Sequence, residues 1–157
     1  MNAQSGKVDI LDASNPANPT KVAEASAGGD KEINSVAVRP DGLAIAAVQQ
    51  ADKTENGEAL IFDAASGDEL GRVPLGALPD NVHITKDGAY ALTANEGEPS
   101  DELTADGTEY AKDPEGTVSV ISLPDGVAAP SVADVRTADF RAFDGPDAEL
   151  DPSIRVF

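Results

Sequence analysis

The sequence predicts an all-β protein, organised as a partial β-propeller of about three four-stranded antiparallel blades. The first observation is a repeated hairpin, because residues 35–48 and 81–94 each contain a strand-like run, an Asp-Gly turn and a second run. The two copies are offset by 46 residues. The second observation is a glycine followed by alternating β-type residues, which occurs at 6–12, 57–63 and 116–122. Such a unit, repeated in order, is typical of propeller blades.

The remaining strands follow from their place in the repeat. A weaker strand precedes each hairpin, at residues 21–25 and 71–75. Each unit therefore has four short strands, which is the content of one blade. We expect residues 1–12 to be the last strand of a preceding blade and residues 13–63 to form the first complete blade. Residues 64–122 are expected to form a second blade with an acidic loop at 96–115. Residues 123–157 are expected to start the next blade.

Two alternatives remain open at this point. The same strands could form a two-sheet sandwich, although the ordered repetition of the unit favours the propeller. The alanine-rich segment 44–47 could form a short helix. We interpret it as a tightly packed inner strand, in which small side chains let neighbouring blades approach each other.

Composition excludes several classes of function. The 157 residues include 11 Lys and Arg against 29 Asp and Glu, which gives a formal net charge of -18. Such a chain is repelled by nucleic-acid phosphates and by anionic lipid. The absence of cysteine excludes disulfides, thiolate catalysis and Cys-ligated metals. No apolar run approaches the ~20 residues needed to span a bilayer, so we expect no membrane insertion within this chain.

Six short segments stand out besides the repeat, at residues 32–38, 76–80, 94–99, 113–121, 137–140 and 154–157. Together they resemble the bacterial choice-of-anchor I family, which is also labelled mesenchyme-specific cell-surface glycoprotein-like or atypical alkaline phosphatase-like. The resemblance covers nearly the whole chain in the order of the family.

The resemblance implies a secreted, periplasmic or cell-surface protein that contains a propeller of about seven blades. Members of the family are much longer than this chain, so the sequence corresponds to an N-terminal portion of two to three blades. The phosphatase label of some members implies a possible hydrolase, but the family supplies no agreed catalytic residues to assign here. The N-terminal residues lack the charged and apolar regions of a signal peptide.

The loop at 96–115 is the strongest candidate for a metal site. It is 20 residues long and rich in carboxylates, with Lys112 as its only cation. Calcium prefers six to eight oxygen ligands, and a divalent cation would relieve the repulsion between these carboxylates. The spacing is not that of an EF-hand, and a solvated flexible loop is the alternative. The candidate ligands are Asn95, Glu96, Glu98, Asp101, Asp106, Asp113 and Glu115.

Three other residues are candidates for a functional role. Asn34 and Asp80 precede equivalent strands, where propeller loops face one end of the central channel, so they could line a ligand site. Capping of turns by side-chain to backbone hydrogen bonds is their alternative role. His83 stands alone within a strand, which favours a structural histidine over a metal ligand. No nucleophile elbow, zinc-protease, P-loop or dinucleotide motif occurs, so the catalytic residues are unknown.

The sequence thus favours an extracellular or cell-surface binding or structural module that belongs to a larger protein or assembly. The alternative is part of a metal-dependent, phosphatase-like hydrolase. We expect its partners to be further propeller blades or another protein chain, joined through open strand edges.

Overall fold

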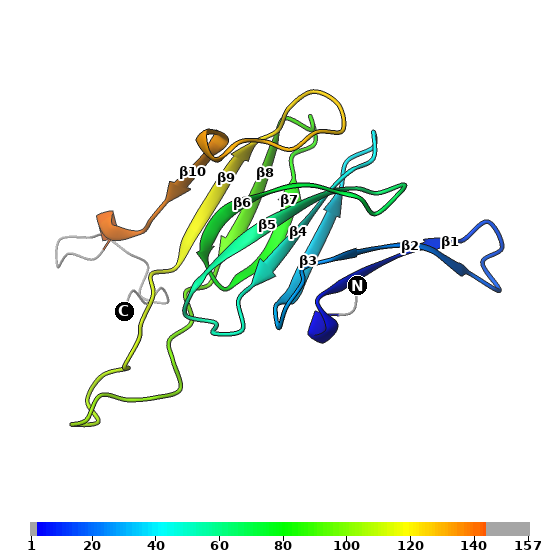
Figure 1. Cartoon of the computed structure of the whole chain (residues 1–157). Coiled ribbons are helices and arrows are strands. Elements are labelled where there is room, and N and C mark those ends of the chain that lie inside the picture. The colour runs from blue at the N-terminus through cyan, green and yellow to red at the C-terminus, as the bar shows by residue number, and fades with distance from the viewer. Residues whose placement is uncertain (1–2, 144–157) are drawn as a thin grey trace.

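A computed structural model describes residues 3–143 of the chain. Its strands form three antiparallel sheets, which contain two, four and four strands (Figure 1). The only helices in this described range are single 3-10 turns, η1 (Ala3–Ser5), η2 (Val132–Asp134) and η3 (Arg141–Phe143). No helix in the described range is long and apolar enough to cross a membrane. The fold is the predicted all-β partial propeller.

The first sheet is a two-stranded hairpin, which we call the N-terminal hairpin. It pairs β1 (Lys7–Asp12) with β2 (Thr20–Ser26). Val8 and Ala25 form one of its cross-strand pairs, and both are buried. In Figure 1 the loop of this hairpin projects away from the two larger sheets.

The first blade is a four-stranded meander in which each strand pairs with the next along the chain. Its strands are β3 (Glu32–Val38), β4 (Leu43–Gln49), β5 (Asn56–Asp63) and β6 (Glu69–Ala77). Residues 43–48 are fully buried on both faces of the sheet. The predicted strand at 44–47 is thereby confirmed, since it lies within β4. The small alanine side chains let both neighbouring sheets approach it closely.

The second blade repeats the same topology. Its strands are β7 (Pro79–Ile84), β8 (Tyr90–Asn95), β9 (Thr117–Ser122) and β10 (Val135–Ala138). A single residue, Leu78, separates β6 from β7, and its φ of 48° turns the chain out of the first blade. One residue is too few for a hairpin within one sheet, so β7 starts a new sheet.

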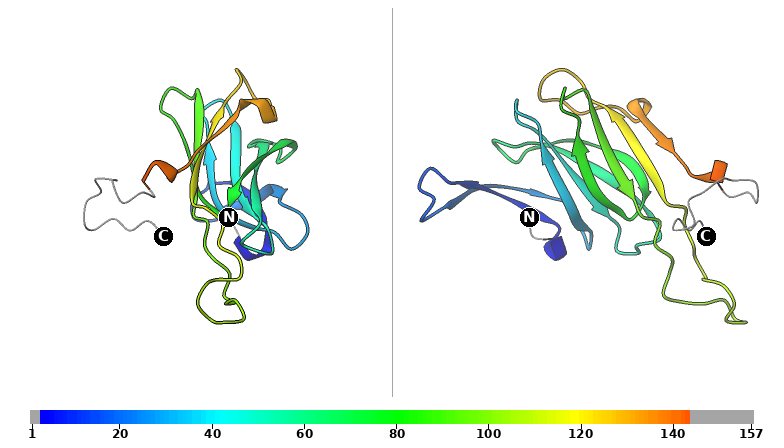
Figure 2. Two further views of the ribbon diagram at one scale, coloured as in Figure 1. Left: turned by 90° about the vertical axis from the view of Figure 1, so that its left-hand side faces the viewer. Right: turned by 180° about the vertical axis from the view of Figure 1, so that it is seen from behind.

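The three sheets join through their faces. Side chains of β4 alternate between the two sides of the first blade, as strand geometry requires. Ile45 and Ala47 pack in a core with Val82, Ala91 and Ile121 of the second blade. Ala44, Ala46 and Val48 lie in a separate core, which includes Val8 and Ala25 of the hairpin. Figure 2 shows the stacked arrangement from two further directions.

The grouping of strands into sheets differs from the expected blades by one strand. Strand β2 was expected to open the blade at 13–63, but it pairs with β1. Strand β6 was expected to open the blade at 64–122, but it closes the first blade by pairing with β5. Strand β10 closes the second blade, whereas residues 123–157 were expected to start a new one. A repeat fixes the length of the unit but not the strand at which a sheet begins, and residues 144–157 lie outside the described range.

The repeat is also not uniform within the hairpins. Val38 pairs with Ala44, whereas the residue equivalent to Val38, Ile84, pairs with Ala91. The offset is therefore 46 residues in the first strands but 47 in the second strands. The turn of the second hairpin is longer by one residue, since the bond that closes it runs from the Thr85 N–H to the Tyr90 carbonyl. A shift of one residue exchanges the two faces of a strand, so the uniform offset of 46 assigns the wrong faces to β8.

Candidate functional site

Asn34 and Asp80 occupy equivalent positions at irregularities near the start of β3 and β7. The strand register shifts on either side of each residue. The Asn34 side-chain amide donates to Oε1 of Gln49 at 2.7 Å and to the Pro79 carbonyl at 3.1 Å. Asn34 thereby ties the first blade to the first residue of the second, which gives it a structural role.

The second blade carries a different pair at these positions. The register makes Asp80 equivalent to Asn34, and Glu96 equivalent to Gln49. Both side chains are now carboxylates, so neither donates a hydrogen bond to the other as the Asn34 amide does. Both residues are exposed. A ligand at the channel end of these strands stays a prediction.

Asn95 lies in a buried polar cluster between the blades. It is 2% exposed, and its amide donates to Oγ1 of Thr117 at 3.0 Å and to Oγ of Ser119 at 2.9 Å. Its side-chain oxygen accepts a hydrogen bond from the Thr93 hydroxyl. Asn95 thus points into the protein, away from the acidic loop that it was expected to assist. The hydroxyl groups satisfy the amide in a place where water cannot reach it.

The acidic loop is an ordered arm and not a structureless loop. Its two sides run antiparallel, with hydrogen bonds from Ser100 N–H to the Lys112 carbonyl and from Ala111 N–H to the Glu102 carbonyl. A β-bridge joins Leu103 and Tyr110. We call residues 97–115 the arm, which projects at the lower left of Figure 1 beyond the ends of the sheets.

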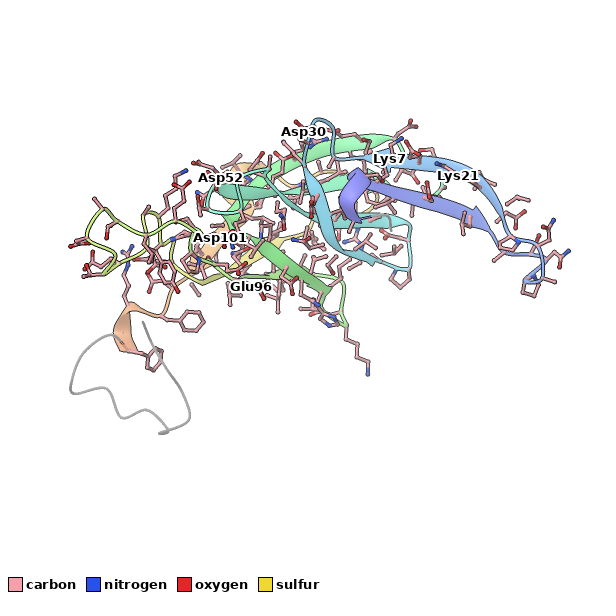
Figure 3. The ribbon with its side chains drawn as sticks, turned by 90° about the horizontal axis from the view of Figure 1, so that it is seen from below. Lys7, Lys21, Asp30, Asp52, Glu96 and Asp101 are labelled. Atoms are coloured by element: carbon pink, nitrogen blue, oxygen red, sulfur yellow. The ribbon has the colours of Figure 1, made fainter. Side chains whose placement is uncertain are left out.

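The predicted metal ligands are dispersed over this arm. Glu98 and Asp101 form ion pairs with Lys53 of the preceding blade, at 3.3 Å and 3.2 Å. Asp106 accepts a hydrogen bond from Thr104, and this bond holds its pKa below the usual range. Glu115 accepts from both Nε and Nη2 of Arg141. Glu96 follows β8 and directly precedes the arm, and Figure 3 labels it together with Asp101 of the arm.

Two lysines fasten the arm to the loop between β4 and β5. Lys53 extends from that loop to the arm, and Lys112 extends back from the arm to Asp52 at 2.6 Å and to Glu55 at 3.4 Å. The hydrogen bond from Lys112 is the main reason that the pKa of Asp52 is strongly lowered. The ion pairs of Lys53 and Lys112 reduce the repulsion between the carboxylates of the arm, which was the reason to expect a bound divalent cation. Within residues 3–143 no three His, Asp or Glu side chains gather where they could hold a metal ion.

Calcium binding therefore stays a prediction without a preformed site in the described residues. Asp113 and Glu115 line a groove of about 640 Å³ between the outer strands of the blades. Its other lining residues include Leu75, Val132 and Val135. Calorimetry with Ca²⁺ tests the prediction, and the absence of heat at millimolar metal would contradict it.

Among residues 3–143, no other sheet covers one face of the second blade, which we call the free face. The register shows that its residues correspond to those that the first blade buries against the second. Thus Leu92 corresponds to Ile45, and Val120 corresponds to Ile61. Tyr90 is 43% exposed, whereas its counterpart Leu43 is fully buried. The residues of the free face are Tyr90, Leu92, Ala94, Val118, Val120 and Ala138.

His83 and Arg136 lie at the two edges of this face. Both are exposed, and they end the cross-strand row that contains Leu92 and Val120. His83 is an exposed strand residue, and its structural interpretation stays a prediction. The free face was not predicted from the sequence, because the extra residue in the preceding turn decides which side chains of β8 lie on it.

The family model of the choice-of-anchor I domain matches residues 1–157. The chain belongs to this family. The resemblance that the short segments indicated is thereby confirmed over the whole sequence. The name of the choice-of-anchor I domain indicates a surface-anchoring module of a bacterial cell-surface or secreted protein. The comparison with curated proteins gives no match.

Proposed function

We propose that this choice-of-anchor I chain is an extracellular or cell-surface structural and binding module, which works by stacking its free face on a further β-sheet. The first blade supports this proposal, because the same face of that sheet is fully buried by the second blade. The single observation that carries it is the register equivalence between Ile45 and Leu92 and between Ile61 and Val120.

The opposite end of the stack has a different chemistry. Lys7, Asp9, Lys21 and Glu24 form ion pairs along the N-terminal hairpin, on the side opposite to its buried Val8. Figure 3 shows Lys7 and Lys21 on this hairpin. The hairpin thus exposes mainly charged side chains beside Leu11 and Val22, whereas the free face is apolar between His83 and Arg136 at its edges. The second blade is therefore the end at which we expect a partner sheet.

The proposed contact is between faces and not between strand edges. In residues 3–143 the two hydrophobic cores that join the sheets are both formed by sheet faces. Apolar surface that leaves water contributes about 25 cal/mol per Å², so a covered face is strongly favoured over an open one. The open strand edges that the sequence analysis invoked would give hydrogen bonds but no such burial.

Sedimentation velocity and binding of a hydrophobic dye test this function. We expect the chain to associate as its concentration rises, or to bind the dye on its free face. A variant with both Leu92→Glu and Val120→Glu should stay monomeric and lose the dye. The matched control is Leu70→Glu on β6, another exposed leucine, which should behave as the unmodified chain.

A monomer at every concentration that also fails to bind the dye would contradict the proposal. Equal effects of the control and of the double variant would contradict it as well, because they would mean that only the added charge matters. No observation in the described residues favours the phosphatase-like alternative, which stays a prediction.

A further inference from the structure

The arm carries an exposed apolar pair near its tip. Leu103 and Tyr110 face each other across the arm and are 54% and 50% exposed. Cross-strand pairing alone accounts for their contact with each other, but not for two large apolar side chains on an element that projects into solvent. Tyrosine is also a side chain that often dominates protein interfaces.

The surroundings of this pair are acidic. Glu102 precedes Leu103 and Glu109 precedes Tyr110, while Asp106 lies in the turn between them. The lysines at the base of the arm are already engaged in ion pairs with Asp52 and Asp101. The tip therefore carries an exposed apolar pair on a segment, residues 102–110, whose charged side chains are all acidic.

The arm is held in place before any partner arrives. Gly97 adopts a φ of +62°, and a Cβ at this position would lie 2.5 Å from the backbone of Glu115 and Gly116. The two ends of the arm thus meet closely at its base. The ion pairs of Lys53 and Lys112 fix its direction relative to the first blade. Such preorganisation lowers the entropic cost of binding.

We propose that the arm is an interaction element that inserts Leu103 and Tyr110 into an apolar slot with a cationic rim on a partner protein. Charge complementarity selects this partner, because electrostatic attraction guides association between oppositely charged surfaces. Nucleic acid is negative and therefore does not fit the arm, and a second copy of this chain is disfavoured there because its net charge is also -18. The proposal is independent of the free face, which lies on a different element.

The chain offers a direct spectroscopic readout. It contains no tryptophan and two tyrosines, so Tyr90→Phe leaves Tyr110 as the only source of tyrosine emission. The probe is a short synthetic peptide of alternating Lys and Leu, titrated into the Tyr90→Phe chain. We expect the emission of Tyr110 to change and the affinity to fall as salt is added. A peptide in which Ser replaces every Leu should bind at least about tenfold more weakly, a difference of about 1.4 kcal/mol.

Two matched variants separate the arm from the free face. In the same background, Leu103→Ser should weaken binding about tenfold, whereas Leu92→Ser should leave it unchanged. Circular dichroism checks that both variants keep the fold. Equal binding of the two peptides, or unchanged binding to the Leu103→Ser variant, would overturn the inference. Loss of binding only with Leu92→Ser would place the probe on the free face, which overturns the arm and supports the proposed function.

Discussion

Single arginine side chains connect the sheets of this protein. Arg39, whose side chain is 10% exposed, donates to the carbonyls of Gly88, Pro124 and Gly126 in the second blade. Its contact with Asp41 raises its own pKa and lowers that of the carboxylate. A charged donor satisfies three carbonyls that would otherwise need water, so one residue of a turn holds two blades together.

Arg72 has the equivalent role on the other side of the first blade. It donates to the backbone carbonyls of Ser26 and Ala27, next to the N-terminal hairpin, and forms an ion pair with Glu58. Burial disfavours the charged form of Glu58, but hydrogen bonds from Lys31 and Arg72 outweigh this effect. The pKa of Glu58 therefore lies below its ordinary value.

This lowered pKa predicts acid sensitivity. A glutamate whose pKa is lower in the folded state stabilises the fold above its ordinary pKa of about 4.3, and the contribution is lost as the pH falls through the folded value. Glu58→Gln should therefore lower the free energy of unfolding by about 1 kcal/mol at neutral pH, since the pair is only partly buried. The difference from the unmodified chain should shrink in acid.

Denaturant unfolding at neutral pH and near pH ~3 measures this difference. The matched control is Glu109→Gln on the exposed arm, which should change stability little at either pH. A gap of the same size at both values would show that the charge of Glu58 is not responsible.

The candidate site residues illustrate how far single residues can be interpreted from sequence. Asn34 and Asp80 were expected to precede equivalent strands, whereas the structure places them within β3 and β7, at equivalent irregularities of the register. Asn95 was chosen for its oxygen ligand and proved to be a buried interface residue. Local sequence does not reveal which side of a strand a side chain takes when the length of the preceding turn is uncertain.

At the scale of elements, the close contact of β6 with the second blade depends on a glycine. A Cβ on Gly76 would lie 2.5 Å from Oγ1 of Thr117 and 2.9 Å from Nδ2 of Asn95. A hydrogen in place of a side chain lets the two sheets approach over the buried polar cluster.

Gly76→Ala should therefore destabilise the fold by about 1–3 kcal/mol through overpacking. Thr117→Ala should rescue part of this loss, because it removes the hydroxyl that the new methyl group meets while Ser119 still accepts from Asn95. The measurement is the free energy of unfolding of both single variants and of the double variant.

The control for this cycle is Gly107→Ala in the arm. A Cβ at this position meets nothing within 4 Å, so the variant suffers only the backbone strain of its positive φ. Additive costs of Gly76→Ala and Thr117→Ala would mean that the two residues do not collide. That result would contradict the close packing of β6 on the polar cluster.

The hairpin-like structure of the arm was also indicated by a turn dipeptide in the sequence. The length of the arm suggested a loop without secondary structure, but Asp106-Gly107 is the same turn dipeptide that marked the two hairpins. The hydrogen bonds from Gly107 N–H to the Thr104 carbonyl and from Thr104 N–H to the Glu109 carbonyl close this turn. The apolar pair beside it was therefore accessible to sequence analysis.

At the scale of the whole molecule, the first blade is covered on both faces and the second blade on one. The residues at equivalent positions are nevertheless similar, as Ile45 and Leu92 show. The difference between them lies in what covers each sheet and not in the local sequence.

Equivalent truncations should consequently have unequal costs. Ile45→Ala removes a fully buried side chain and should cost about 2–5 kcal/mol. Leu92→Ala, on the free face, should cost less than about 1 kcal/mol in this chain alone. Thermal or urea unfolding of the two variants measures the difference, and equal costs would show that the free face is already covered.

The repeat and the alternation of side chains determined much of this protein from sequence alone. They predicted the hairpins, the meander of short strands and the strand at 44–47, because turn dipeptides and period-two patterns act locally. The tertiary structure alone decided the strand at which each blade begins, the faces of β8 and the pairing of Lys53 and Lys112 with distant carboxylates. These features depend on one extra turn residue and on contacts between sheets, which link residues far apart in the chain and leave no local pattern.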